Sequence, residues 1–169
     1  TVNVLRRVLA TVERYPDRPA LEIGERQWTY AALWSVAGAI AEGIAQVAGS
    51  GTAPVALFAA RSFATYAGIL GILRTGRAYL PMNLKFPVSR AVRMLQLSGC
   101  DTVLLSDEFE EYYRRIETEM PGRGRIICVK EDKEMPPDGP RITVHSSSEC
   151  AWATSEIGDR SEEHTSELQ

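Results

Sequence analysis

The sequence has few of the residues that hold metals or form disulfides. Its three cysteines, Cys100, Cys128 and Cys150, are far apart and form no Cys-x-x-Cys pair. An odd, dispersed set of this kind is typical of reduced thiols in a cytoplasmic protein and not of a disulfide framework. The two histidines, His145 and His164, do not stand near the cysteines at the spacing of zinc ligands. The sequence therefore predicts no metal site.

The sequence also lacks a strong excess of charge of either sign. It has 19 basic and 22 acidic residues, which give a formal net charge of −3. This balance leaves no electrostatic footprint for a nucleic-acid partner. No stretch approaches the about 18 apolar residues of a membrane span, and nothing resembles a signal peptide. With 44% hydrophobic and 24% charged residues, we expect a globular cytoplasmic protein that has no membrane partner.

The most strongly patterned part of the chain is residues 61–90. Ser62 is suited to cap a helix, because its hydroxyl can accept a hydrogen bond from an early N–H of that helix. Apolar residues then recur at helical spacing up to Gly76, which stands where a helix often ends in a left-handed residue. A short extended run follows at 78–80, and we expect Pro81 to end its capacity for ladder hydrogen bonds.

Two glycines, Gly68 and Gly71, lie inside the helix expected after Ser62. Each costs about 1 kcal/mol relative to alanine in a helix interior. Their presence suggests close packing of this helix against a neighbouring backbone, and a tolerated cost without such packing is the alternative.

Short apolar runs alternate with helical patterns along the rest of the chain. The expected helices lie at 4–12, at 30–47 with Thr29 as its cap, at 88–97, and at 107–119 with Asp107 as its cap. The expected strands lie at 54–59, 102–105, 126–129 and 141–144, and the runs 20–23 and 26–29 read as a hairpin. The run at 54–59 is apolar almost throughout, as in a parallel sheet buried on both faces. This alternation predicts an α/β fold class with a mostly parallel sheet and right-handed crossovers.

Two motifs are similar to those of a known family. Residues 28–33 (Trp-Thr-Tyr-Ala-Ala-Leu) resemble Leu-Thr-Tyr-x-Glu-Leu, the first core motif of the adenylate-forming, or AMP-binding, superfamily. Residues 73–83 resemble the second core motif, Leu-Lys-Ala-Gly-x-Ala-Tyr-Val-Pro-Leu-Asp, with Asn83 in place of the final Asp. The Phe-Pro-x-x-Arg continuation at 86–90 is more similar to the amino-acid adenylation domains of nonribosomal peptide synthetases than to acyl-CoA synthetases. The resemblance covers residues 4–106 in the family's order and spacing.

The resemblance implies that residues 1–145 form a partial N-terminal subdomain of an adenylation domain. The parent enzyme would join a carboxylic acid, here an amino acid, to AMP with ATP and Mg²⁺. It would then pass the acyl group to the phosphopantetheine thiol of a carrier protein. In this family the phosphate loop, the magnesium ligand, the ribose-binding acid and the reactive lysine all lie downstream of the two motifs. We therefore expect an inactive fragment with no catalytic residue and no cofactor of its own. Four motif residues are expected to be structural: Tyr30, Gly76, Tyr79 and Pro81.

Residues 146–159 show no periodicity, so we expect irregular structure there. Thr154 and Ser155 are similar to the first residues of the family's phosphate loop, and an accidental Thr-Ser pair is the alternative. Glu156 and Asp159 then stand in place of glycines. Their charges would repel a polyphosphate. The sequence thus predicts, at most, a truncated approach to the phosphate loop.

The last ten residues, 160–169 (Arg-Ser-Glu-Glu-His-Thr-Ser-Glu-Leu-Gln), have a separate explanation. They match, codon for codon, the translation of a common sequencing-library adapter. We interpret them as a sequencing-adapter artefact and leave them out of the fold. A genuine polar C-terminal tail is the alternative.

Two other functions compete with the truncated adenylation enzyme. The chain could be a stand-alone βαβ module that binds a nucleotide or a protein, although no Gly-x-Gly-x-x-Gly stands at an expected strand–helix turn. It could also be a fragment of an acyl-CoA synthetase.

Overall fold

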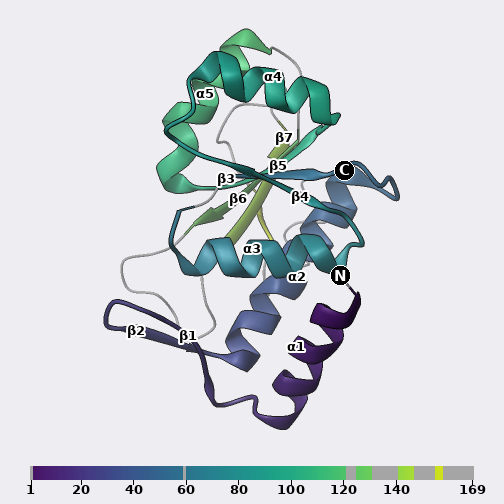
Figure 1. Cartoon of the computed structure of the whole chain (residues 1–169), viewed down its shortest axis with the longest axis vertical. Helices are drawn as coiled ribbons and strands as arrows, with labels where there is room; N and C mark the ends of the chain where they lie inside the picture. Colours follow the sequence, from purple (N-terminus) through teal and green to yellow (C-terminus); the bar gives the residue numbers. More distant parts are fainter. Residues whose placement is uncertain (1, 59, 121–124, 131–140, 147–154, 158–169) are drawn as a thin grey trace.

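A sheet lies between two layers of helices in the computed structural model, which describes residues 2–58, 60–120, 125–130, 141–146 and 155–157 (Figure 1). The order of the described strands is β4-β3-β5-β6-β7-β8. Their bounds are β3 (Val55–Phe58), β4 (Tyr79–Met82), β5 (Thr102–Ser106), β6 (Arg125–Lys130), β7 (Arg141–Ser146) and β8 (Ser155–Ile157). The first four in this order pair in parallel, and β7 and β8 pair antiparallel. The predicted α/β class with a mostly parallel sheet is confirmed.

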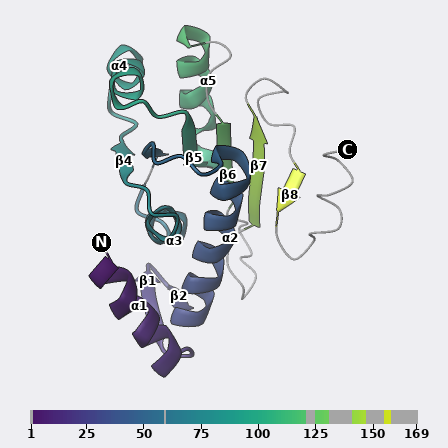
Figure 2. The same cartoon turned by 90° about the vertical axis from the view of Figure 1, so that its right-hand side faces the viewer.

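Helices α2 (Tyr30–Ala48) and α3 (Phe63–Arg74) cover one face of the sheet. The other face is covered by α4 (Val88–Ser98), the 3₁₀ turn η1 (Asp107–Phe109) and α5 (Glu110–Glu119) (Figure 1). Helix α1 (Val2–Arg14) and the predicted hairpin of β1 (Pro19–Ile23) and β2 (Arg26–Thr29) lie beside α2 (Figure 2). The order of elements therefore follows the predicted alternation.

The two faces of the sheet bury two separate apolar clusters. Val55 and Leu57 of β3 pack in the cluster beneath α2 and α3. Ala56 and Phe58, which alternate with them, belong to the cluster beneath α4 and α5. Aromatic rings of η1 and α5 surround the Phe58 ring edge-on, with centroids 5.7–5.9 Å away. Burial on both faces explains why β3 has no polar alternation.

The predicted helix ends are largely confirmed. The Thr29 hydroxyl accepts a hydrogen bond from the Ala32 N–H at 3.1 Å, and Ser62 Oγ accepts one from the Thr65 N–H at 3.3 Å. Gly76 follows α3 with a φ of 78°, a left-handed conformation that glycine adopts without steric cost. The expected helix at 107–119 differs, because it opens with η1 and no side-chain hydrogen bond caps α5.

A buried arginine binds the C-terminal end of α2. Arg77 is 4% exposed, and its guanidinium donates hydrogen bonds to the carbonyls of Ala48, Gly49 and Ala53 at 2.8–3.3 Å. These include carbonyls at the helix C-terminus, where a cation is favoured. Arg77 thus ties the end of α2 to the start of β4.

The sequence led us to expect that Pro81 ends the ladder of hydrogen bonds. This expectation is wrong, because β4 continues to Met82. Val55 lies opposite Tyr79, and its N–H donates to the carbonyl of Ala78 at 3.0 Å. In a parallel pair the bonding then alternates, so the backbone groups of Tyr79 and Pro81 face away from β3. Pro81 therefore removes no hydrogen bond between the two strands.

Helix α2 corrects the expectation that no stretch could span a membrane. By length and composition alone, this helix is long and apolar enough to cross a membrane, with a mean hydropathy of 1.4 over its most apolar window. In the fold, however, Val36, Ile40 and Ile44 are buried in the cluster that α2 shares with α3 and the sheet. Helix α2 thus contributes one side to the core.

Candidate functional site

The carboxyl ends of β3 and β5 are the first place where a ligand site is expected. From β3 the chain crosses through α3 to β4 on one side, and from β5 it crosses through α5 to β6 on the other. The direction of winding therefore reverses between these two neighbouring strands. In open α/β sheets, ligands bind outside the carboxyl ends of the strands at such a reversal.

A crevice does lie at this point, but it is small. Phe58, Thr65, Leu104 and Ser106 are among its lining residues, and its volume is about 10 Å³. This is the space of one water molecule, whereas sites for small-molecule ligands have roughly 300–1,000 Å³. A nucleotide or an amino acid does not fit there.

The polar groups around this crevice already have partners. Thr65 Oγ1 donates to the carbonyl of Ala60 and lies 3.2 Å from Ser62 Oγ. Ser106 Oγ donates to Glu108 Oε1 at 2.9 Å. These hydroxyls therefore stabilise the start of α3 and the turn after β5. Sequence reasoning missed both, although each stands shortly after an expected buried strand, at 54–59 or 102–105.

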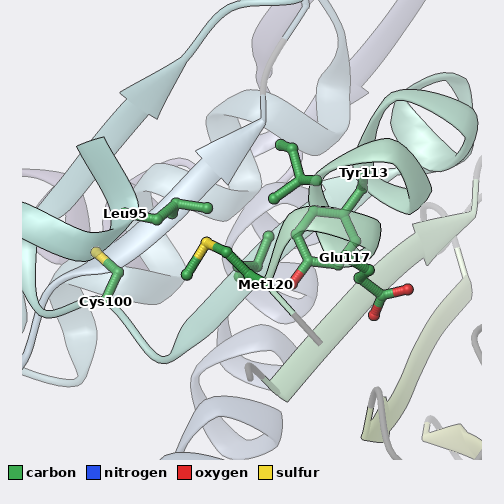
Figure 3. A pocket seen from close by; sticks show the side chains of 7 residues that line it. Leu95, Cys100, Tyr113, Glu117 and Met120 are labelled. Carbon is green, nitrogen blue, oxygen red and sulfur yellow. The ribbon is translucent and has the colours of Figure 1, made fainter. Parts of the chain in front are cut away.

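A second crevice lies beneath α5 and is lined by Cys100, Tyr113, Glu117 and Met120, among others (Figure 3). Its volume is also about 10 Å³. Burial raises the pKa of the Cys100 thiol, which favours the protonated and less nucleophilic form. Burial likewise raises the pKa of the Tyr113 hydroxyl and of the Glu117 carboxyl.

Glu117 is the one acid with a buried oxygen that lacks a hydrogen-bond partner among the described residues. Its carboxylate points away from Cys100 in Figure 3, so the two do not form an acid–base pair. Within the described part of the chain, no group of three or more His, Cys, Asp and Glu residues could hold a metal ion. We derive no catalytic step from the described residues.

The predicted loop residues lie at the limit of the described structure. Thr154 lies outside the described residues. Ser155 is the first residue of β8, where its backbone pairs with Val144 of β7. Residues 155–157 thus form a strand within a range expected to be irregular, because the edge of β7 offers backbone partners. The phosphate-loop interpretation of Thr154 and Ser155 stays a prediction, and the adapter interpretation of 160–169 also falls outside the described residues.

The four motif residues expected to be structural lie in scaffold elements. Tyr30 is the first residue of α2, Gly76 forms the turn after α3, and Tyr79 and Pro81 belong to β4. None of them lines either crevice.

The chain is similar in sequence to a known peptide synthetase and in fold to two solved enzymes. Surfactin synthase subunit 3 of Bacillus subtilis (strain 168) is 32% identical over 120 residues, which are 71% of this chain and 9% of that protein. The fold matches the anthranilate CoA ligase AuaEII, solved with anthranoyl-AMP, with a TM-score of 0.66 and 13% identity, over 84% of this chain and 33% of AuaEII. It also matches the nonribosomal peptide synthetase FmoA3 bound to alpha-methyl-L-serine-AMP, with a TM-score of 0.60 and 22% identity, over 84% of this chain and 18% of FmoA3.

The chain therefore spans a third or less of each of these proteins. The family model described as AMP-binding enzyme matches residues 8–164. This match covers nearly the whole chain and includes both motifs. The chain thus belongs to the AMP-binding enzyme family, the adenylate-forming superfamily that its two motifs predict.

Proposed function

We propose that this chain is the N-terminal part of an amino-acid adenylation domain of a nonribosomal peptide synthetase. The whole enzyme would activate a carboxylic acid, here an amino acid, as its acyl-AMP, with ATP and Mg²⁺. It would then pass the acyl group to the phosphopantetheine thiol of a carrier protein. The observation that carries this proposal is the family match over residues 8–164, together with a peptide synthetase relative that is 32% identical.

Within this proposal, residues 1–145 are scaffold and the chemistry lies elsewhere in the enzyme. The four motif residues that lie in scaffold elements, Tyr30, Gly76, Tyr79 and Pro81, support this division. Thr154 and Ser155 would begin the phosphate loop. Residues 160–169 would not belong to the enzyme, although the family match runs on to residue 164. We place the parent enzyme in the cytoplasm.

Amino-acid-dependent exchange of pyrophosphate into ATP tests the proposal. We expect none from the purified 169-residue chain. We expect exchange from the longer protein obtained by reading the source DNA past codon 159. Exchange by the 169-residue chain itself would contradict its role as scaffold, and a longer protein that shows no exchange with any amino acid would contradict the adenylation function.

The likeness to AuaEII keeps an acyl-CoA ligase as the second candidate, although at 13% identity it supports the fold alone. Thiol acceptors separate the two candidates. An amino-acid adenylation enzyme transfers its acyl group to a phosphopantetheinylated carrier protein, and a ligase transfers it to free CoA. Calorimetry of the 169-residue chain with ATP tests the stand-alone binding module, which requires saturable binding near physiological concentration.

A further inference from the structure

Charge is distributed very unevenly along this chain. Residues 43–100 include six basic residues and no acidic one, although the whole chain has a net charge of −3. The next 19 residues, 101–119, include seven acidic residues and two arginines. A block of one sign in an otherwise acidic chain creates a local positive field. The six basic residues are Arg61, Arg74, Arg77, Lys85, Arg90 and Arg93.

The fold uses two of these six cations internally. Arg77 is buried and donates to carbonyls at the end of α2, and Arg74 lies over an aromatic ring of α2 and donates to a carbonyl of that helix. Three of the other four stand together, before or within α4. Among the described residues, no ion pair involves Lys85, Arg90 or Arg93, and all three are exposed. Their charges are therefore available to a partner.

Two of these cations and a leucine form one side of α4. At 3.6 residues per turn, Arg90, Arg93 and Leu97 project within about 60° of one another. This side lies opposite the buried one, which contains Val92 and Leu95. Leu97 is 78% exposed, the largest fraction among the exposed large hydrophobic side chains of the described residues. We call Arg90, Arg93 and Leu97 the α4 face.

The residues just before α4 hold the N-terminal end of this face in place. The Arg90 guanidinium lies over the Phe86 ring, 4.3 Å from its centroid. The Phe86 carbonyl accepts a hydrogen bond from the Tyr112 hydroxyl of α5 at 2.7 Å. Leu84 and Lys85, which precede this ring in the chain, are both exposed. A guanidinium that is held in this way loses less conformational entropy when it binds a partner.

The surroundings of the α4 face favour a protein partner. Helices α4 and α5 lie together on the far side of the sheet from α2 and α3 (Figure 1). Six of the ten residues of α5 are charged, as expected of a helix that faces solvent. Interfaces between proteins are enriched in arginine and aromatic residues and depleted of acidic ones. A membrane-bound helix inserts its apolar side into lipid, whereas the apolar side of α4 is buried in the core.

We propose that the α4 face, with Leu84 and Lys85 at its end, is a docking surface for an acidic amphipathic segment of another protein. Charge complementarity identifies the occupant, because three exposed cations without an ion-pair partner among the described residues attract carboxylates. Carboxylates of the segment bind the guanidiniums of Arg90 and Arg93, which suit two parallel hydrogen bonds each. An apolar side chain between these carboxylates contacts Leu97. This docking is independent of the proposed adenylation activity.

Fluorescence anisotropy with synthetic peptides tests the surface. The probe is a fluorescein-labelled helical peptide of about 15 residues, long enough to span α4, in which glutamates flank a line of leucines. One control peptide has serines in place of the leucines, and another has lysines in place of the glutamates. We expect the 169-residue chain to bind the Glu–Leu peptide saturably and at least about fivefold more tightly than the Glu–Ser peptide. Binding should weaken at least about tenfold between about 0.05 M and about 0.5 M NaCl, because salt screens exposed charges.

Substitutions locate the binding on α4. Arg93→Glu should weaken binding of the Glu–Leu peptide at least about tenfold, and Leu97→Ser should weaken it about fivefold. Arg7→Glu is the matched control, because Arg7 is an exposed arginine of α1 near the exposed Leu9, and it should change binding less than about twofold. The double variant Arg90→Glu, Arg93→Glu should bind the Lys–Leu peptide instead, and this gain also shows that the variant is folded.

Four results would overturn the proposal. The first is no saturable binding of the Glu–Leu peptide, and the second is equal weakening by Arg93→Glu and Arg7→Glu. The third is a dimer in sedimentation velocity at low salt that Arg93→Glu abolishes, which would favour a second copy of this chain as the occupant. The fourth is tighter binding to vesicles of phosphatidylcholine and phosphatidylglycerol than to the peptide, lost in Leu97→Ser, which would favour a lipid surface.

Discussion

Replacing Gly71 by alanine tests how closely α2 and α3 approach. A Cβ atom at residue 71 would lie 2.6 Å from Ile40 Cγ2, 2.7 Å from Ile40 Cβ and 2.9 Å from the carbonyl oxygen of Ala37. The last two atoms are fixed to the backbone of α2 and cannot rotate away. Ordinary contacts between carbon atoms are about 3.5–4.0 Å. The two helices would therefore have to move apart by about 1 Å.

Gly68 provides a matched control in the same helix. Its added Cβ would lie 2.7 Å from Leu104 Cδ2 and 3.2 Å from Leu57 Cδ1. Both atoms are ends of flexible side chains, so the crowding can be relieved without moving a backbone. The two substitutions share the same gain in helix propensity, about 1 kcal/mol. They differ only in what the new methyl group meets.

Overpacking of a well-packed core costs about 1–3 kcal/mol, and the rigid contacts of Gly71 argue for the upper part of that range. After the propensity gain is subtracted, we expect Gly71→Ala to lower the free energy of unfolding by about 2 kcal/mol. We expect Gly68→Ala to change it by less than about 1 kcal/mol. Urea unfolding followed by far-UV circular dichroism measures both. A Gly71→Ala variant as stable as the parent, or more stable, would refute the close approach of the two helices.

Four further predictions concern single contacts and the chain end. Arg77→Met leaves three carbonyls without their donor and should lower the free energy of unfolding by about 3 kcal/mol in urea melts. An unchanged midpoint of urea unfolding would show that the three hydrogen bonds of Arg77 do not stabilise the fold. Ser62→Ala should cost about 1 kcal/mol because it removes a cap, whereas Ser89→Ala should cost under about 0.5 kcal/mol; equal losses would exclude the cap. Burial raises the pKa of Glu117, so the folded state keeps this carboxyl protonated at pH values above the usual pKa of a Glu side chain. Relative to Glu117→Gln, the parent should therefore lose stability as the pH rises from that usual pKa through the raised one. Parallel curves of unfolding free energy against pH for the two proteins would contradict the raised pKa. Deletion of residues 160–169 should leave the melting temperature unchanged, and a clear drop would favour a genuine tail.

The sequence was sufficient to predict the elements that depend on local chemistry. The caps at Thr29 and Ser62 and the left-handed turn at Gly76 were predicted because each depends on one residue and its immediate neighbours. The close packing suggested by the cost of a glycine inside a helix is present at Gly71, where a Cβ would meet the backbone of α2. At Gly68 the nearest atoms belong to side chains and not to a neighbouring backbone.

Features that depend on partners distant in the chain could not be predicted in the same way. Whether Pro81 interrupts a strand depends on which side of that strand faces β3, and one residue of register decides this. Arg77 reads as an ordinary charged residue, and only the fold brings it to carbonyls 24–29 residues away. The crevice at Thr65 and Ser106 likewise forms only when β3 and β5 lie side by side.

The placement of Pro81 in β4 makes the two edges of the sheet unequal as partners for a further strand. On the outer side of β4 the backbone positions belong to Tyr79 and Pro81, and a proline has no N–H to offer. A foreign strand that approached this edge would find one donor where a regular strand provides two, which disfavours strand addition and fibril-like stacking there. Among the described strands, new pairing is added only at the opposite side, where β7 and β8 extend the sheet from β6. One residue of a family motif thereby makes the β4 edge a poorer template for a further strand than a regular edge would be.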